Sequence, residues 1–172
     1  MWYDFPVMEE SGHNLASIRS VCFTGHRELP APRSPAYRQL VGGTEAAIRR
    51  AYGRGARKFY CGGAEGFDLL AGRLVLLEQT RHPDMQLILL LPYTGFGERF
   101  VARDRAELQR QKKAAQEMIF LSAHYFPGCM AIRNRQLVEE ADLCIAYLNR
   151  APSGTAQTVG FAREKGIEVI YV

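Results

Sequence analysis

Six short apolar segments alternate with longer amphipathic segments along most of the chain. The apolar segments cover residues 20–24, 58–61, 86–91, 117–121, 143–148 and 168–172. Each is four to six residues long, and most are apolar at every position rather than at every second one. Such runs are typical of strands that are buried on both faces, as in a parallel sheet. The pattern therefore predicts six buried parallel strands.

Helix-length segments lie between these strands. Ser34 followed by Pro35 combines a helix N-cap with a proline at the first helical position, and glycines follow Tyr52, where this helix is expected to end. The other helix-length segments are 67–80, 97–115, 129–140 and 155–165. The segment 97–115 carries many charges of both signs, so it is expected to be a helix covered by solvent.

This alternation of strands and helices defines the expected fold class. Strands that alternate with helices are joined by right-handed crossovers, which place helices on both faces of a parallel sheet. We expect an α/β fold with a six-stranded, doubly wound sheet. Neither a repeat nor a low-complexity linker interrupts residues 19–172, so they are interpreted as one domain, and residues 1–18 as an N-terminal arm.

Composition limits the kinds of protein and partner to consider. The chain has 172 residues, of which 47% are hydrophobic and 23% charged, and this excludes an intrinsically disordered or fibrous protein. The net charge is +4, and 18 of the 22 basic residues are arginine. Arginine suits bidentate phosphate contacts, but an arginine-rich solvated surface explains the same numbers and is favoured at this stage.

The cysteines and histidines do not predict a metal site. Cys22, Cys61, Cys129 and Cys144 are far apart, and the four histidines are scattered without ligand spacing. Buried reduced thiols are expected, which favours a cytoplasmic location. The first 20 residues lack the apolar core of a signal peptide, and the longest aliphatic run, Leu87–Leu91, is too short to span a membrane.

Candidate ligand-binding residues are those that follow the strands, because doubly wound sheets bind ligands beyond the carboxyl ends of their strands. After the first strand come Thr24, Gly25, His26 and Arg27. Glycine lets a ligand approach the backbone, while Thr24 and Arg27 can contact phosphate or a carboxylate. An ordinary turn with exposed side chains is the alternative.

A glycine-rich loop follows the second strand and leads into a helix. It consists of Gly62, Gly63, Ala64, Glu65 and Gly66. Its N–H groups and the helix N-terminus would favour an anion, although neither the dinucleotide fingerprint nor a Walker A loop is present. A tight turn is the alternative explanation for the glycines. Asp68, in the first helical turn, either favours the helix dipole or accepts hydrogen bonds from ribose hydroxyls.

Three later junctions add further candidates. Pro92 and Tyr93 follow the third strand, where Tyr93 would either stack on a base or lie at the rim. Arg133 and Arg135 diverge on a helix, so only one of them can face a site beside Asn134. Ser153, Gly154 and Thr155 follow the fifth strand and form a small-residue turn suited to an anion. Thr155 could instead simply cap the helix.

Together these motifs resemble a known family. The order of Phe23 to Arg27, Gly62 to Asp68, Arg133 to Arg135 and Ser153 to Thr155 is similar to that in the YpsA-like branch of the SLOG superfamily. That superfamily includes the Lonely Guy phosphoribohydrolases and DprA-type DNA-processing proteins. The resemblance spans residues 19–172 and implies a Rossmann-like, mostly parallel fold that binds a nucleotide or a nucleotide-derived ligand, with phosphate at the glycine loop and the Gly-Thr turn.

The resemblance also bears on catalysis. In the Lonely Guy enzymes an arginine and a later glutamate carry cleavage of the bond between base and ribose. Arg133 matches that arginine and is the candidate catalytic residue, but Gln157 and Thr158 occupy the place of the glutamate. Gln cannot ionise, so this mechanism lacks its carboxylate unless Glu65 or Asp68 supplies it.

Three functions follow, in order of preference. The first is binding of ADP-ribose, NAD or a nucleoside phosphate as a sensor or carrier, with no further cofactor required. The second is hydrolysis or transfer at the N-glycosidic bond of a nucleotide. The third is DprA-like association with DNA, which is disfavoured because the charged segment 97–115 mixes both signs and has no aromatic stacking platform. No membrane partner is expected, and a homodimer is possible.

Overall fold

A computed structural model of the chain describes residues 17–172, and its six strands form one parallel sheet. The strands are β1 (Ser20–Gly25), β2 (Lys58–Cys61), β3 (Gln86–Leu91), β4 (Glu117–Phe120), β5 (Leu143–Tyr147) and β6 (Glu168–Tyr171). Their spatial order is β4-β3-β2-β1-β5-β6, and all five pairings are parallel. Every predicted strand is present, with bounds that differ by at most one residue at either end.

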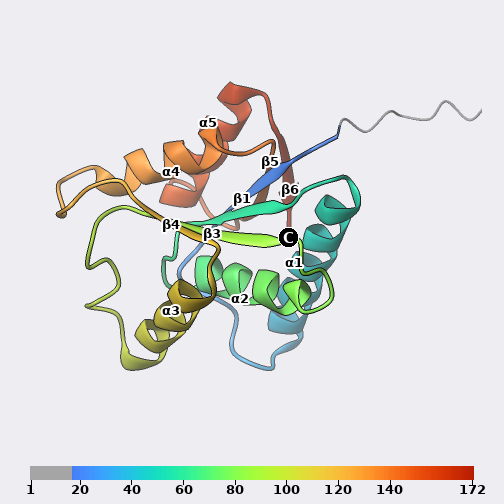
Figure 1. The fold of residues 1–172 in the computed structure, drawn as a ribbon, viewed down its shortest axis with the longest axis horizontal. Helices are drawn as coiled ribbons and strands as arrows, with labels where there is room; N and C mark the ends of the chain where they lie inside the picture. Colours follow the sequence, from blue (N-terminus) through green and yellow to red (C-terminus); the bar gives the residue numbers. More distant parts are fainter. Residues whose placement is uncertain (1–16) are drawn as a thin grey trace, which may run out of the picture.

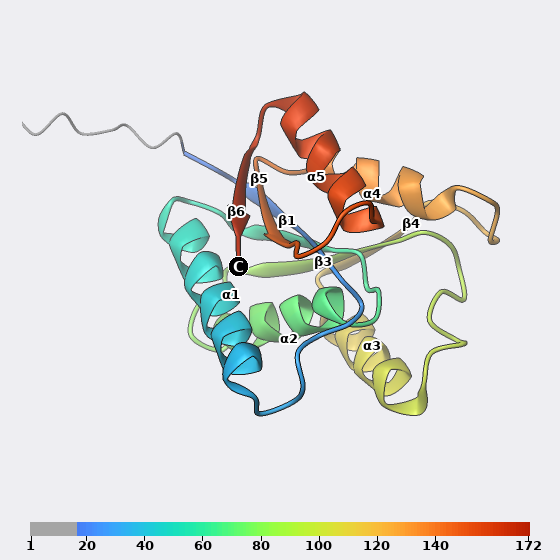
Figure 2. The ribbon, with the colours of Figure 1, turned by 180° about the vertical axis from the view of Figure 1, so that it is seen from behind.

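Five helices cover the two faces of this sheet. They are α1 (Pro35–Gly53), α2 (Phe67–Gln79), α3 (Ala102–Ala114), α4 (Cys129–Glu139) and α5 (Gly154–Lys165). Figures 1 and 2 show α1, α2 and α3 on one face and α4 and α5 on the other. The predicted α/β, Rossmann-like, doubly wound fold with helices on both faces is therefore confirmed.

The chain changes direction across the sheet at β1. From β1 it moves outward through β2 and β3 to β4, and then returns so that β5 pairs with the other side of β1. The pairing runs from Val21 opposite Leu143 to Gly25 opposite Tyr147. In a doubly wound sheet, the loops after two such strands separate to opposite faces and leave a crevice at the carboxyl edge. The topology thus places a crevice between the ends of β1 and β5.

Separate apolar cores lie on the two faces. Alternate residues of the central strands enter each core, as Phe23 enters the core under α1 and α2, while Cys22 enters the core under α4 and α5. On the first face Phe23 stacks on Phe59 and meets Phe67 edge to face. All four cysteines are buried free thiols. The central strands are buried on both faces as predicted.

The two edge strands differ from this prediction. β4 has Met118 at 45% and Phe120 at 40% exposure, and Tyr171 of β6 is 49% exposed. Their apolar composition suggested burial on both faces, but an edge strand has a sheet neighbour on one side only. β4 and β6 are the two ends of the strand order. Sequence alone cannot distinguish an apolar edge strand from a central one.

The charged helix begins five residues later than predicted. We expected it from Gly97, whereas α3 starts at Ala102. Gly97 has a positive φ of 93°, which a helix cannot accommodate, and the N–H of Phe100 closes a turn onto its carbonyl. The helix itself is largely covered by solvent, as predicted, since only Leu108 and Gln111 are buried.

Most of the predicted N-terminal arm lies outside the described residues. Of residues 1–18, the structure describes Ser17 and Ile18, and Ile18 is buried and donates its N–H to the Arg54 carbonyl at 3.3 Å. Within residues 17–172 we find no helix with the length and apolar character needed to cross a membrane.

The cap of α1 offers a test of the local structure. Ser34 Oγ accepts a hydrogen bond from the Tyr37 N–H at 3.1 Å, as the sequence predicted. Ser34→Ala should lower the free energy of unfolding by about 1 kcal/mol, measured by urea denaturation, because this N–H loses its partner. Ser34→Asp retains an accepting oxygen and should stay close to the wild type. Equal losses in both variants would contradict the capping role.

Candidate functional site

A hollow of about 370 Å³ lies at the carboxyl edge of the sheet, where β1 and β5 separate. Residues from four junctions surround it: the end of β1 and the loop after it, the start of α2, the first turns of α4, and the loop that leads into α5. The lining residues are Phe23, Thr24, Gly25, His26, Arg27, Glu28, Ala64, Asp68, Met130, Arg133, Asn134, Arg150, Ser153, Gly154 and Thr155. We call it the switch-point hollow.

A buried carboxylate and a buried guanidinium lie at the base of the switch-point hollow. Asp68 is 6% exposed and Arg133 is 3% exposed. Both approach Gly62 so closely that a Cβ there would lie 2.5 Å from Arg133 Nη1 and 2.8 Å from Asp68 Oδ2. Gly62 must therefore lack a side chain for these two charges to converge.

Hydrogen bonds hold both groups in place. Arg133 donates through Nη1 to the Gly62 carbonyl and through Nε to Asn134 Oδ1 at 2.8 Å. Asp68 Oδ2 accepts the Ala64 N–H at 3.3 Å. Among residues 17–172, Arg133 Nη2 and Asp68 Oδ1 have no partner, yet neither atom is fully enclosed. Each group therefore keeps one polar atom available to a ligand.

Burial affects the protonation of both groups. Burial raises the pKa of Asp68, and the neighbouring Arg133, the Ala64 N–H and Arg27 act in the opposite direction. Burial likewise lowers the pKa of Arg133, while Asp68 supports its charge. Each charge is therefore stabilised mainly by the other, since little water reaches either of them.

The N-terminus of α5 supplies open N–H groups. Ser153 caps this helix by accepting the Ala156 N–H at 3.0 Å. The N–H groups of Gly154 and Thr155, which line the hollow, have no acceptor among residues 17–172. By contrast, the first N–H of α2, that of Phe67, donates to the His26 carbonyl. The start of α5 therefore keeps its first two N–H groups open to an anion.

His26 connects the loops that follow β1 and β5. Its Nε2 accepts the Asn149 N–H at 3.0 Å, so this nitrogen carries no proton and the imidazole is neutral. Burial lowers the pKa of His26, and the neighbouring Arg150 lowers it further. Its ring meets that of Tyr147 edge to face. These contacts give His26 a structural role in shaping the hollow.

Two arginines stand at the exposed rim. Arg150 forms an ion pair with Glu28 at 3.3 Å, and both side chains are largely exposed. Arg27 is also exposed and makes no ion pair within residues 17–172. The rim thus presents guanidinium groups that are free or only weakly committed, because exposed ion pairs contribute little stability.

The structure brings eleven of the predicted site residues together around the hollow. These are Thr24, Gly25, His26, Arg27, Ala64, Asp68, Arg133, Asn134, Ser153, Gly154 and Thr155. Five others do not line it, namely Gly62, Gly63, Glu65, Pro92 and Tyr93, and Gly66 lines a neighbouring hollow. The two arginines diverge as predicted: Arg133 is buried, while Arg135 is exposed and lies near Glu164.

The glycine loop has a packing explanation for each of its glycines. Besides Gly62, Gly63 has a φ of 68°, and a Cβ there would meet Leu91. Gly66 has a φ of 83° and packs against the Arg27 backbone. The loop therefore acts on the site by allowing Asp68 and Arg133 to converge, whereas Ala64 is its only member that lines the hollow.

Sequence reasoning missed four lining residues and placed Tyr93 differently. Phe23, Glu28, Met130 and Arg150 line the hollow but were not among the candidate site residues. Arg150 lies in the loop that follows β5, and this position beyond a strand end was the available signal. Tyr93 instead meets Phe96 and Tyr125 edge to face, and it does not line the switch-point hollow.

The fold and the hollow define a Rossmann-like α/β protein with a polar site at its topological switch point. A family model named YpsA, described as the YspA SLOG family, matches residues 22–164, and the chain belongs to this family. This confirms the resemblance found in the sequence. No curated protein matches the chain.

Two solved structures share the fold. DNA processing protein A (DprA) from Streptococcus pneumoniae superposes with a TM-score of 0.65 at 20% identity, covering 89% of this chain and 50% of that one. DprA from Helicobacter pylori, described for its single-stranded DNA binding mode, gives 0.64 at 21% identity, covering 89% and 64%. The chain thus spans less than two-thirds of either protein, and the likeness is one of fold.

The environment of His26 predicts a titration below the ordinary value. Its imidazole should titrate below about 6.5 in an NMR pH series, since burial disfavours the charged form. The unfolded chain then binds the proton more readily than the folded one, so the free energy of unfolding should fall as the pH drops from about 6.5.

His26→Gln should reduce this pH dependence, because glutamine does not titrate and still offers an oxygen to the Asn149 N–H. His124→Gln is the matched control, since His124 is exposed on the loop before α4 and does not line the hollow. A His26 resonance that titrates above 6.5 would disprove the proposed neutral state.

Proposed function

We propose that the chain binds a nucleotide or a nucleotide-derived ligand, such as ADP-ribose, NAD or a nucleoside phosphate, in the switch-point hollow, as a sensor or carrier. The observation that carries the proposal is the pairing of two unlike polar elements in one hollow. On one side lie the open N–H groups of α5, and on the other lies the buried pair of Asp68 and Arg133.

The α5 side suits a phosphate. The N–H groups of Gly154 and Thr155 lie at the positive end of the helix dipole, where anions are favoured. Thr155 is 6% exposed, and its hydroxyl makes no hydrogen bond within residues 17–172. Arg27 and Arg150 at the rim add positive charge. A phosphate there would receive backbone and hydroxyl hydrogen bonds together with charge neutralisation.

The Asp68 side suits hydroxyl groups. An ionised carboxylate repels phosphate, but its free Oδ1 accepts hydrogen bonds from neutral donors. A sugar attached to the phosphate would supply such donors, while Arg133 Nη2 would donate to a sugar oxygen. The two sides together therefore fit a ribose phosphate better than an inorganic anion alone.

Hydrolysis of an N-glycosidic bond is a second candidate function. No carboxylate stands in the place of the missing glutamate, because Gln157 and Thr158 occupy it. Gln157 is exposed, and Thr158 donates its hydroxyl to the Gly154 carbonyl at 2.9 Å. Asp68, however, is a buried carboxylate beside Arg133 and supports this candidate. Released base from nucleoside monophosphates, lost in Asp68→Asn, would favour catalysis over binding.

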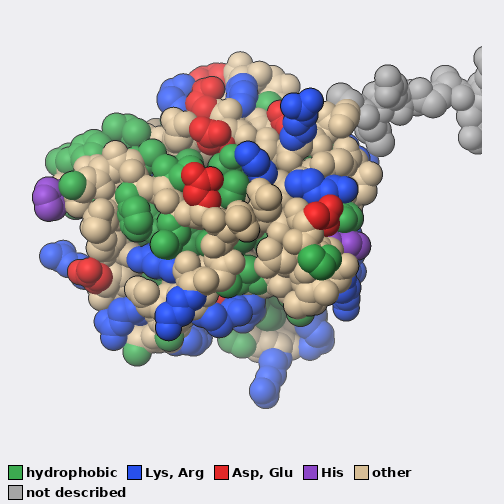
Figure 3. Space-filling view, viewed as in Figure 1, with side chains coloured by type: hydrophobic (Ala, Val, Ile, Leu, Met, Phe, Trp, Pro, Cys, Tyr) green, Lys and Arg blue, Asp and Glu red, His purple; other side chains and the backbone are tan. Residues whose placement is uncertain are grey.

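DNA association is a third candidate, suggested by the fold shared with DprA. In Figure 3, Lys and Arg side chains gather over the lower part of the face, around α2 and α3, among some acidic side chains. Binding of a single-stranded oligonucleotide that weakens steeply with salt, and that free ADP-ribose does not displace, would favour this candidate.

We further propose a cytoplasmic location, which the four free thiols support.

The proposal predicts that a methyl group at the start of α5 blocks binding. A thermal-shift series with ADP-ribose, NAD and AMP should raise the Tm by roughly 5–10 °C at about 100 times Kd, because ligand binding stabilises the native state by mass action. Gly154→Ala should weaken this binding at least about tenfold, since its Cβ would lie beside the open N–H groups.

Gly160→Ala on the same helix is the matched control. A Cβ has open space at both positions, so neither substitution should disturb packing. Gly160 does not line the hollow, and its variant should bind like the wild type. No Tm shift with any of the three ligands at millimolar concentration, or equal binding by both variants, would refute the proposed site.

A further inference from the structure

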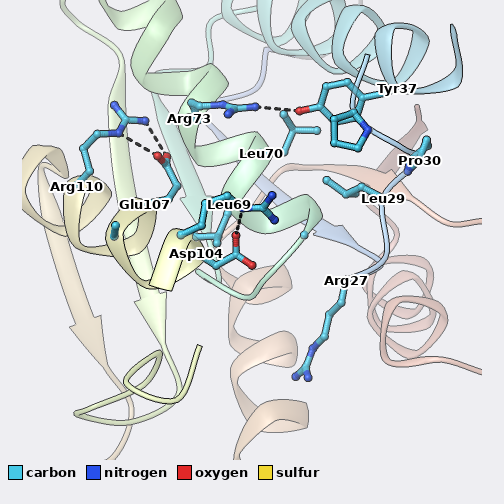
Figure 4. A pocket seen from close by; sticks show the side chains of 14 residues that line it. Arg27, Leu29, Pro30, Tyr37, Leu69, Leu70, Arg73, Asp104, Glu107 and Arg110 are labelled. Carbon is cyan, nitrogen blue, oxygen red and sulfur yellow. Dashed lines mark hydrogen bonds and ion pairs between the residues drawn. The ribbon is translucent and has the colours of Figure 1, made fainter. Parts of the chain in front are cut away.

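A second and larger hollow, of about 650 Å³, lies next to the switch-point hollow. The loop after β1, the start of α1, α2 and α3 enclose it, and Figure 4 shows the side chains that line it. We call it the α2–α3 hollow. The site described above does not use it.

The interior of the α2–α3 hollow is apolar. Leu69 and Leu70 on α2 are 5% and 3% exposed, and Leu29 and Pro30 from the loop after β1 lie opposite (Figure 4). Tyr37 on α1 adds a half-buried aromatic ring. Such surfaces suit a flat, largely apolar group, since apolar walls with a few polar groups are typical of small-molecule sites.

Several polar side chains around this hollow bind one another. Arg110 holds Glu107 through two hydrogen bonds of 2.7 and 3.0 Å, and Arg103 donates to Asp104 at 3.1 Å. Arg73 donates to the Tyr37 hydroxyl at 3.1 Å, as Figure 4 shows. Both lining carboxylates thus bind an arginine, while four arginines line the hollow in all, so its charges are only partly balanced. The apolar walls favour an uncharged group, and the polar side chains around them can form hydrogen bonds with it.

Arg27 connects the two hollows. It lines both, and Figure 4 shows its guanidinium directed away from the leucine side chains of the α2–α3 hollow. Gly66, at the start of α2, lines the larger hollow, whereas Asp68, two residues later, lines the switch-point hollow. A single ligand that passes Arg27 can therefore reach both.

We infer that the α2–α3 hollow binds the nucleoside portion of a two-part ligand whose other part, a ribose phosphate, lies in the switch-point hollow. This inference rests on the proposed function and narrows it. The ligand class is two ribosyl units joined by a diphosphate, as in ADP-ribose, with Arg27 beside the diphosphate. The base lies against the apolar walls, and Asp104, one of whose oxygens has no partner within residues 17–172, accepts a hydrogen bond from it.

Ala106→Trp tests the inference. Ala106 is exposed and lines the α2–α3 hollow, so an indole there occupies the hollow without entering the core. The matched control is Ala114→Trp, at an exposed position on the same helix that lines neither hollow. Binding of ADP-ribose and of ribose 5-phosphate to the full chain is measured by calorimetry.

The wild type is expected to bind ADP-ribose at least about tenfold more tightly than ribose 5-phosphate. Ala106→Trp should reduce ADP-ribose affinity to that of ribose 5-phosphate and leave the smaller probe unaffected. Ala114→Trp should change neither affinity.

Other results separate the two proposals. If ribose 5-phosphate binds and Ala106→Trp leaves ADP-ribose affinity unchanged, or weakens both probes alike, the inference is overturned and the switch-point site stands. If neither probe binds the wild type, the proposed function fails and the inference fails with it.

Discussion

The parallel pairing of β1 with β5 is the constraint on which the rest of the site depends. Because β1 pairs with β2 on one side and with β5 on the other, the loops that follow β1 and β5 must leave toward opposite faces of the sheet. The crevice between them is a consequence of topology and needs no particular side chain. His26 then connects the two loops by accepting the Asn149 N–H.

Within that crevice, the arrangement of charge is unusual for a mildly basic protein. Its two deepest charges, Asp68 and Arg133, have opposite signs and come from α2 and α4, on opposite faces of the sheet. Burying either alone would be costly, and their proximity offsets part of the desolvation. Both can approach Gly62 only because it has no side chain. The surplus of positive charge lies instead at the rim, with Arg27 and Arg150.

The two hollows differ in their polar groups and in the character of their walls. The switch-point hollow combines open N–H groups with buried charges that keep free polar atoms, while the α2–α3 hollow has apolar walls and carboxylates that are already bound by arginines. These are complementary requirements, one for a phosphorylated sugar and the other for a base. Because Arg27 lines both hollows, one extended ligand explains them more simply than two separate ligands.

The sequence by itself determined the fold and most of the residues that line the switch-point hollow. Apolar runs and helix signals such as Ser34-Pro35 are local, so they located every strand and helix, and the rule that ligands bind beyond strand ends located eleven of the lining residues. Only the tertiary structure decided which strands are edges, because that depends on neighbours far along the chain. It likewise showed that Gly62 serves the convergence of Asp68 and Arg133, and that loops and helices distant in sequence enclose a second hollow, since such contacts leave no local pattern.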